Sequence, residues 1–263
     1  MKPKTTQTTN TATSVKCYLA LGDSMSISAY TGVPDGGAVA QFHKRLCQRR
    51  EPNGKPAVWK LIDESYDGCV MSGVPLTQRP GGVDLITCTI GGNDLLQNLH
   101  RGIDAYRPEF EASYRRLMER LQKLARRPKP SPEAIEAIGK YRCNDVVELL
   151  AAGKITKEEA ARMADEFTDP HRIADEFGRD AIVIVGNIYR PTPGTLSDHL
   201  LAALDGVNAF IGEQVRKCGH RLADIAGAFL GNEEQYLVMN IEPNLAGATE
   251  IARLFEEAYD RPR

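Results

Sequence analysis

The sequence predicts an α/β protein, a three-layer α/β/α sandwich around a doubly wound parallel sheet. Short apolar stretches typical of buried strands alternate along the chain with segments of helical periodicity. This alternation favours a parallel sheet with both faces covered, and right-handed crossovers complete the sandwich. The length of 263 residues allows one large domain or two small ones, and 42% hydrophobic residues with only 6% aromatic predict an aliphatic core.

The expected elements follow in a regular order after a polar, Thr-rich segment at residues 1–13, which we predict to be a disordered tail. The predicted strands are 15–21, 57–63, 83–90, 180–189 and, as a strand or near-strand, 221–229. Helical periodicity marks residues 37–50, 199–219 and 244–260. The helix at 199–219 has an apolar stripe and ends at a glycine, as helices commonly do.

One segment, at about residues 129–178, interrupts the alternation and is predicted to be a helical insert. Residues 144–167 within it have the pattern of a helical hairpin, in which Thr156 and Glu159 form a capping box. Its apolar face is expected to comprise Leu149, Leu150, Ile155, Ala160 and Met163. The insert precedes the fourth strand, whereas ligands bind at the carboxyl edge of such sheets. This favours a structural role, or docking of a protein partner, over an active-site lid.

Charge and composition exclude several classes of function. Lys plus Arg (33) nearly balance Asp plus Glu (35), so no basic surface is expected for nucleic acid or anionic lipid. The six cysteines show no C-x-x-C pair, which favours free, buried thiols over a zinc site. The N-terminal segment has no apolar region typical of a signal peptide, and no run approaches the ~18 residues needed to span a bilayer. We expect a cytoplasmic protein without a membrane segment or a zinc site.

Three loops that follow predicted strands carry residues typical of serine hydrolysis. They are Gly22-Asp23-Ser24, Asp67-Gly68-Cys69 and Gly91-Gly92-Asn93-Asp94, all expected at the carboxyl edge of the sheet. A serine nucleophile needs an exposed hydroxyl on a tight turn and hydrogen-bond donors for the oxyanion. The backbone N–H groups of Ser24 and Gly68 and the side-chain amide of Asn93 are candidates for these donors. Each loop alone is also compatible with a simple turn or helix cap, but their combination is more specific.

The stretches "ALGDSMS", "DGC" and "TIGGNDLL" resemble the first three sequence blocks of the SGNH (GDSL-type) esterase/lipase superfamily. "VGNIYRPTPG" resembles the loop after the fourth strand, and "IEPNLAGATEIARLF" the C-terminal block. The resemblance covers most of residues 15–258 except the insert at 129–178, and it implies a domain of this type over residues 14–263. It implies a flavodoxin-like sandwich with five parallel strands, a Ser24 nucleophile, and an oxyanion hole formed by Ser24, Gly68 and Asn93. It also implies hydrolysis of a small-molecule ester or acetyl group without a cofactor. The G-x-S-x-G pattern of other serine hydrolases is absent, because Ser26 stands where the second glycine is needed.

The C-terminal block departs from the family at the general base. The family pattern D-x-x-H-P reads Met239-Asn240-Ile241-Glu242-Pro243 here, so Glu242 stands where histidine is expected. The reference pKa of glutamate lies about 2 units below that of histidine, which makes Glu242 the weaker base. Among the five histidines, His199 is the best alternative because it follows the fourth strand, although it is also compatible with an exposed residue in a first helical turn.

The replacement of the expected histidine by Glu242 leads to two hypotheses of function from different classes. The first is a serine esterase in which Glu242, or less favourably His199, accepts the proton of Ser24. Asp23 and His199 are expected to contact the substrate in this reading. The second is a pseudo-hydrolase that has the fold and the pocket but binds a ligand or partner without cleaving it. A scaffolding role of the helical insert is a third, weaker reading.

Overall fold

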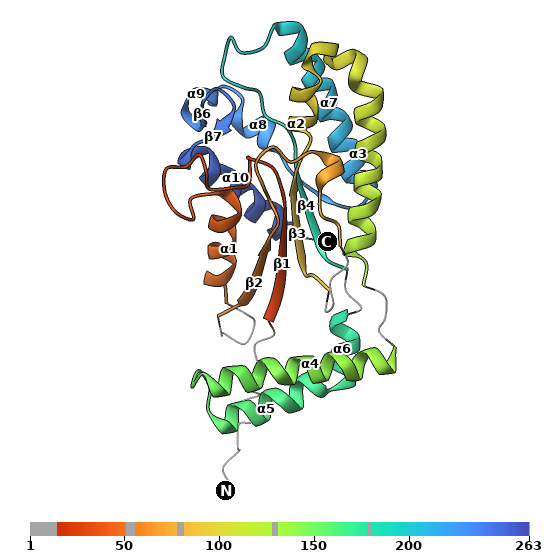
Figure 1. Cartoon of the computed structure of the whole chain (residues 1–263), viewed down its shortest axis with the longest axis vertical. Coiled ribbons are helices and arrows are strands. Elements are labelled where there is room, and N and C mark those ends of the chain that lie inside the picture. The colour runs from red at the N-terminus through yellow and green to blue at the C-terminus, as the bar shows by residue number, and fades with distance from the viewer. Residues whose placement is uncertain (1–14, 51–55, 78–81, 128–130, 178–179, 263) are drawn as a thin grey trace, which may run out of the picture. The chain divides into compact units, whose positions relative to one another are not determined.

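The computed structural model describes residues 15–50, 56–77, 82–127, 131–177 and 180–262, and these residues divide into two compact units. The larger unit contains the sheet and the helices that cover it, and the smaller unit contains three helices, α4 to α6 (Figure 1). The predicted disordered tail, residues 1–13, lies outside the described residues.

The sheet of the larger unit has five parallel strands in the order β2-β1-β3-β4-β5, which confirms the predicted fold class. The strands are β1 (Val15–Gly22), β2 (Val58–Asp63), β3 (Leu85–Thr89), β4 (Ile182–Gly186) and β5 (Arg221–Ala223). In the register of the central strands, Gly22 pairs with Thr89 and Thr89 with Gly186, so three strands end at one level. This is the flavodoxin-like order, whose topological switch point lies between β1 and β3. A ligand site is therefore expected beyond the carboxyl ends of these two strands.

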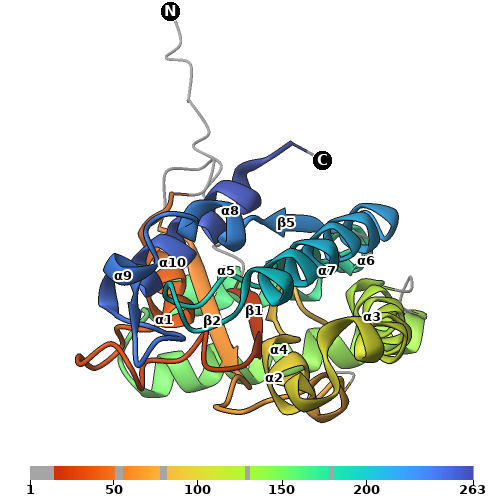
Figure 2. The ribbon, with the colours of Figure 1, turned by 90° about the horizontal axis from the view of Figure 1, so that it is seen from above.

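Both faces of the sheet are covered by helices, which completes the three layers (Figure 2). The covering helices are α1 (Ala38–Gln48) and α10 (Leu245–Asp260) on one face, and α3 (Ile103–Ala125) and α7 (Asp198–Lys217) on the other. Phe42 of α1 packs against Phe255 of α10 with ring centroids 5.7 Å apart, and Tyr114 of α3 against Phe210 of α7 at 6.0 Å. Four of the five residues of β4 and all five of β3 are buried, as expected for a sheet covered on both sides.

Short elements gather in the loops of this unit. They are η1 (Met71–Gly73), α2 (Gly92–Gln97), η2 (Leu99–Arg101), α8 (Ile225–Phe229), α9 (Glu233–Tyr236), β6 (Leu237–Val238) and β7 (Glu242–Pro243). The predicted strand at 221–229 is wrong in its second half, where the chain forms α8. The Asp224 side chain accepts a hydrogen bond from Gly227 N–H at 3.1 Å and starts this helix, so the apolar run changes from strand to helix there.

The smaller unit is built around a helical hairpin. Its helices are α4 (Pro132–Ala151), α5 (Lys157–Thr168) and α6 (Pro170–Phe177). The predicted capping box is present, since Glu159 N–H donates to the Thr156 hydroxyl at 3.1 Å and Thr156 N–H to the Glu159 carboxylate at 2.9 Å. Val146 and Ala160 form a buried apolar cluster with Leu150, Ile155 and Met163. The first helix begins at Pro132, twelve residues before the predicted hairpin, behind the N-cap Ser131.

Within the part of the chain that the structure describes, no helix is both long and apolar enough to cross a lipid bilayer. The six cysteines all belong to the described part of the chain and form no disulfide bond; Cys69 and Cys88 are buried and the other four are partly exposed.

Candidate active site

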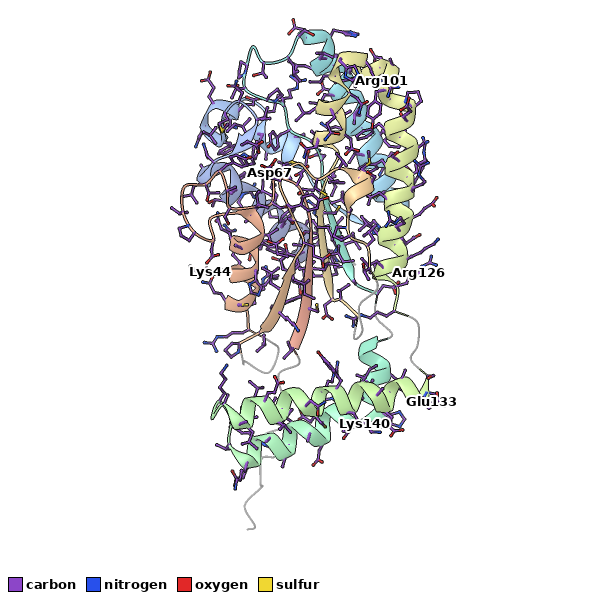
Figure 3. The ribbon with its side chains drawn as sticks, viewed as in Figure 1. Lys44, Asp67, Arg101, Arg126, Glu133 and Lys140 are labelled. Carbon is purple, nitrogen blue, oxygen red and sulfur yellow. The ribbon has the colours of Figure 1, made fainter. Side chains whose placement is uncertain are left out.

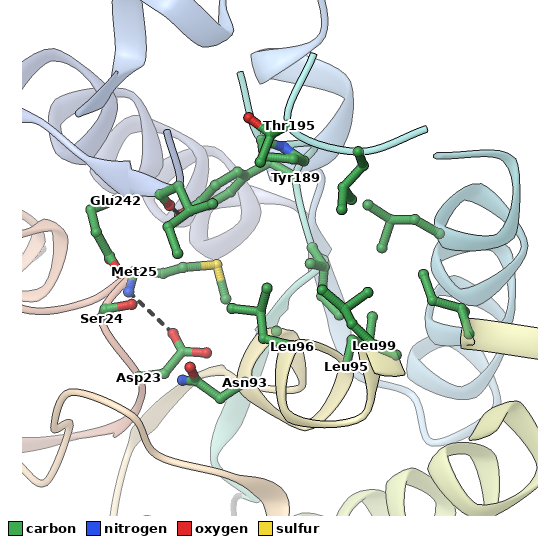
Figure 4. A pocket seen from close by; sticks show the side chains of 17 residues that line it. Asp23, Ser24, Met25, Asn93, Leu95, Leu96, Leu99, Tyr189, Thr195 and Glu242 are labelled. Atoms are coloured by element: carbon green, nitrogen blue, oxygen red, sulfur yellow. Dashed lines mark hydrogen bonds between the residues drawn. The ribbon is translucent and has the colours of Figure 1, made fainter. Parts of the chain in front are cut away.

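Ser24 lies on a tight turn at the carboxyl end of β1. Asp23 N–H donates to the Thr89 carbonyl at 3.1 Å, and Ser26 N–H donates back to the Asp23 carbonyl at 3.1 Å. A Cβ on Gly22 would stand 2.4 Å from the Thr89 hydroxyl oxygen, so glycine is needed here for the close approach of β1 to β3. The turn leaves Ser24 half-buried, with its side chain on the wall of a cavity (Figure 4).

Asp23 is buried beneath this turn and is 2% exposed. Its carboxylate Oδ1 accepts a hydrogen bond from Met25 N–H at 3.1 Å, which is drawn in Figure 4. The pKa of Asp23 is raised to about 8, chiefly by burial and less by the charge of Glu242, while backbone hydrogen bonds act in the opposite direction. The neutral acid therefore predominates at pH 7. Asp23 also lines the cavity, where it stabilises the turn that carries Ser24.

Gly68 lies in the loop after β2, which runs beside the end of β1. Tyr66 N–H donates to the Gly22 carbonyl at 3.1 Å and joins the two segments. Gly68 has φ +73°, in the left-handed region that favours glycine. In the described part of the chain, neither Gly68 N–H nor Ser24 N–H donates to an acceptor. Ser24 lines the cavity, whereas Gly68 is exposed beside it and does not belong to the cavity wall.

Asn93 and Asp94 fasten this loop to the third one. Asn93, the second residue of α2, donates its Nδ2 to the Cys69 carbonyl at 3.1 Å, and its amide has a second N–H that remains available. The buried Asp94 carboxylate accepts Met71 N–H at 3.1 Å, and burial raises the pKa of Asp94. The loops after β2 and β3 are therefore held together beside Ser24, and Asn93 lines the same cavity.

Glu242 lies beside Ser24 on the wall of the cavity (Figure 4). It is the first residue of the short strand β7. Two hydrogen bonds fix the segment just before this strand: the Tyr189 hydroxyl donates to the Ile241 carbonyl at 2.6 Å, and Thr192 N–H donates to the Asn240 carbonyl at 2.9 Å. The C-terminal block therefore reaches the serine although Ser24 and Glu242 are 218 positions apart in the chain.

Burial is the main effect that raises the pKa of Glu242, and the negative charge of Asp67 raises it further. The neighbouring Ser24 hydroxyl opposes this by stabilising the charged carboxylate. Oε2 of Glu242 is buried without a hydrogen-bond partner among the described residues. Asp67 lies in the loop after β2 (Figure 3) and accepts a hydrogen bond from the Tyr30 hydroxyl at 2.5 Å. A partly buried carboxylate with one unpaired oxygen can accept a proton.

The histidines lie elsewhere. The His199 side chain is 78% exposed and its Nε2 lies 3.1 Å from Asp104 Oδ2, so the structure places it outside the cavity. His43, His100, His171 and His220, all of which the structure describes, are also absent from the cavity wall. Burial lowers the pKa of His220 to about 4, and its ring lies at the start of β5, at the other end of the sheet.

The cavity has a volume of about 200 Å³, and most of its wall is aliphatic. Its residues are Asp23, Ser24, Met25, Gly92, Asn93, Leu95, Leu96, Leu99, Ile103, Ile188, Tyr189, Pro191, Thr195, Leu196, Leu204, Ile241 and Glu242. Sequence reasoning brought Ser24, Asn93 and Glu242 together but missed this aliphatic wall and the Tyr30–Asp67 pair. The apolar stripe of 199–219 contains Leu204, but only the tertiary packing of α7 directs it into the cavity.

Among the described residues, no group of three or more histidine, cysteine, aspartate and glutamate side chains is arranged to hold a metal ion.

No family model and no curated protein matches the sequence, whereas many solved structures match the fold. An acetylxylan esterase from Geobacillus stearothermophilus is 14% identical, with a TM-score of 0.57 over 94% of this chain and 95% of that one. A proposed GDSL-like lipase from Parabacteroides merdae is 12% identical, with a TM-score of 0.55 over 92% and 94%. A lipase from a goat rumen metagenome is 18% identical, with a TM-score of 0.51 over 92% and 97%. A catalytic mutant of the Geobacillus esterase, in which a histidine is replaced by alanine, also matches. The chain therefore has an SGNH (GDSL-type) hydrolase fold.

Proposed function

We propose that this protein is a serine ester hydrolase that cleaves a small-molecule ester through an acyl-Ser24 intermediate, with Glu242 as the general base. The observation that carries the proposal is the position of Ser24, which shares the wall of a cavity with the carboxylate of Glu242 and the side-chain amide of Asn93. The fold is that of proteins described as lipases and acetylxylan esterases, which supports the same class of reaction.

In the first half of the reaction, Ser24 Oγ attacks the ester carbonyl carbon while its proton passes to Glu242. The carbonyl oxygen becomes an oxyanion, for which Ser24 N–H, Gly68 N–H and the Asn93 amide are the proposed donors. Collapse of this intermediate breaks the bond to the alcohol, which leaves with the proton from Glu242. Water then attacks the acyl-enzyme and gives its proton to Glu242, and the second collapse releases the acid and returns that proton to Ser24 Oγ.

A carboxylate base changes the electrostatics of these steps. With a histidine base, proton transfer creates a positive and a negative charge, and the imidazolium stabilises the oxyanion. With Glu242, one negative charge moves from the carboxylate to the oxyanion, and the N–H donors alone stabilise it there. The lower basicity of glutamate, about 2 pKa units below histidine, is partly offset by the burial and by the Asp67 charge that raise the pKa of Glu242.

The test is hydrolysis of p-nitrophenyl butanoate by the wild-type protein, Ser24→Ala and the control Ser28→Ala. Ser28 lies in the same loop but is not part of the cavity wall. Its hydroxyl accepts a hydrogen bond from Gly37 N–H at 2.9 Å. We expect Ser24→Ala to lose at least a thousandfold in kcat/KM and Ser28→Ala to stay near wild type. Equal rates for the wild type and Ser24→Ala would refute the proposal.

One observation favours a second candidate, a ligand-binding pseudo-hydrolase: none of the five histidines, all of which the structure describes, lines the cavity. The Geobacillus neighbour, in contrast, has a catalytic mutant in which a histidine is removed. In that case the N–H donors would hold a carbonyl group that is never cleaved. Turnover that appears only in Glu242→His would favour this candidate. Labelling of wild-type Ser24 by a fluorophosphonate would favour the esterase.

A further inference from the structure

The cavity beside Ser24 is polar at one end and aliphatic along the rest of its length. Figure 4 shows Asp23, Ser24, Asn93 and Glu242 at one side, and the leucines of α2 and η2 at the other. The aliphatic part of the wall consists of Met25, Leu95, Leu96, Leu99, Ile103, Ile188, Pro191, Leu196, Leu204 and Ile241. These side chains come from separate segments of the chain that meet only in the folded unit.

The polar groups in this aliphatic part already have partners. The Tyr189 hydroxyl donates to a backbone carbonyl at 2.6 Å, and the Thr195 hydroxyl pairs with another threonine at 3.1 Å. Ile188 N–H donates a hydrogen bond to Asn208 Oδ1 at 3.0 Å, and Asn208 Nδ2 donates one to the Ile188 carbonyl at 2.7 Å. A polar ligand group placed here would lose its water without gaining a hydrogen bond, which is unfavourable.

The polar end fixes which half of an ester enters the cavity. In the proposed reaction, the leaving alcohol oxygen must face Glu242, which supplies its proton. The surroundings of Glu242 are polar, with the Tyr30–Asp67 pair beside it and Gly68 exposed. The acyl chain on the other side of the carbonyl carbon then extends along the aliphatic wall.

We infer that the cavity selects esters of unbranched acyl chains about six to eight carbons long over acetyl esters, an inference that rests on the proposed function. An apolar cavity of about 150 Å³ holds a benzene molecule, which has six carbons, so a cavity of about 200 Å³ accommodates a chain of roughly six to eight carbons. An acetyl group would leave most of this volume without a ligand atom. The floor of the cavity is closed, since Leu204 and Ile103 are each only 3% exposed, whereas Leu96 at the rim is 42% exposed.

The expected size of the preference follows from burial of methylene groups. Each buried methylene contributes about 0.8 kcal/mol, or roughly a fourfold increase in kcat/KM. Four added methylenes, from acetyl to hexanoyl, are therefore worth about 100-fold after allowance for incomplete burial. Once the cavity is full, longer chains gain nothing and must bend or protrude.

The first experiment measures kcat/KM for two series of esters. In one series, p-nitrophenyl esters carry acyl chains of two to twelve carbons; in the other, acetate esters carry linear alcohols of the same lengths. We expect a rise of about 100-fold to a maximum at six to eight carbons in the acyl series and a flat alcohol series. A maximum at acetyl, or a rise confined to the alcohol series, would overturn the inference while leaving the proposed esterase intact.

The second experiment fills the floor of the cavity. Leu204→Phe should lower the octanoyl-to-acetyl ratio of kcat/KM at least tenfold, because the larger ring occupies the volume that the chain end needs. The matched control is Leu230→Phe, since Leu230 is 57% exposed and lies outside the cavity wall. We expect this control to leave the ratio unchanged, and an unchanged ratio in Leu204→Phe would contradict the inference.

The third experiment is independent of turnover and separates the two proposals. Binding of linear 2-alkanones of four to ten carbons to Ser24→Ala is titrated by NMR, since a ketone offers a carbonyl and an alkyl chain but cannot be hydrolysed. Affinity that rises severalfold per added methylene up to about eight carbons supports the cavity assignment even if no ester is cleaved. Affinity independent of chain length would overturn it even if esters are cleaved.

Discussion

The role of Glu242 leads to the most informative prediction. Replacing the glutamate by glutamine keeps the size and shape of the side chain but removes the group that accepts the Ser24 proton. A positioned general base typically contributes 10²- to 10⁴-fold, about 3–5 kcal/mol of transition-state stabilisation. We therefore expect Glu242→Gln to lose 10²- to 10⁴-fold in kcat/KM for p-nitrophenyl butanoate. The matched control is Glu234→Gln, an exposed glutamate on α9 outside the cavity wall, which should remain near wild type.

The pH profile gives the same prediction a second readout. A general base must be ionised to act, so kcat/KM should rise with pH through the pKa of Glu242, which burial and the Asp67 charge raise above the ordinary glutamate value. Removing that charge in Asp67→Asn should lower the pKa of Glu242 and move the acid limb of the profile to lower pH. Glu242→His should move it to higher pH, towards the ~6.5 of an ordinary imidazole. A loss of less than threefold in Glu242→Gln, or an acid limb that stays in place in both Asp67→Asn and Glu242→His, would refute this reasoning.

Three further predictions concern the turn and loops that support Ser24. Asn93→Ala should lower kcat about 10²- to 10³-fold, as measured for loss of an oxyanion donor, while KM changes little in steady-state assays. Gly22→Ala should destabilise the protein by about 1–3 kcal/mol in urea unfolding, because the added methyl group would lie 2.4 Å from the Thr89 hydroxyl oxygen. A change below 0.5 kcal/mol would show that β1 and β3 do not approach this closely. Asp23 has a folded pKa near 8, against about 4 when unfolded, so the folded state binds more protons between these values. The free energy of unfolding should therefore fall as pH rises from about 4 to 8, and Asp23→Asn should flatten this slope; an identical slope in the variant would contradict the burial of a neutral acid.

Much of the fold could be predicted because its strands are buried on both faces. A parallel sheet covered by helices produces short continuous apolar runs, and those at β1, β3 and β4 begin and end within three residues of their predicted limits. The run at 221–229 was ambiguous, because a short apolar segment carries no period that separates a strand from a helix. The Asp224 cap decides the outcome there: Gly227 N–H is its local partner, and the Asn187 side chain, 37 positions away in the chain, reaches it only in the tertiary structure.

The candidate site could be predicted in part for a similar reason. Residues directly after parallel strands meet at one edge of a sheet, so Ser24, Gly68 and Asn93 could be grouped from their positions alone. His199 follows the same rule in sequence, yet the first turn of α7 directs its ring to Asp104 at the surface. The aliphatic wall could not be predicted, because the side chains that line it belong to separate helices and loops whose relative positions are set by the packing of the whole sandwich.

The central claim is that Ser24 becomes acylated and that Glu242 takes its proton. Intact-protein mass spectrometry after brief mixing with p-nitrophenyl hexanoate at low pH and temperature tests it most directly, with peptide mapping to locate the adduct. We predict a hexanoyl adduct on Ser24 in the wild type, the same adduct formed at least 100-fold more slowly in Glu242→Gln, and none in Ser24→Ala. An adduct that persists in Ser24→Ala, or one that forms equally fast in Glu242→Gln, would contradict the account.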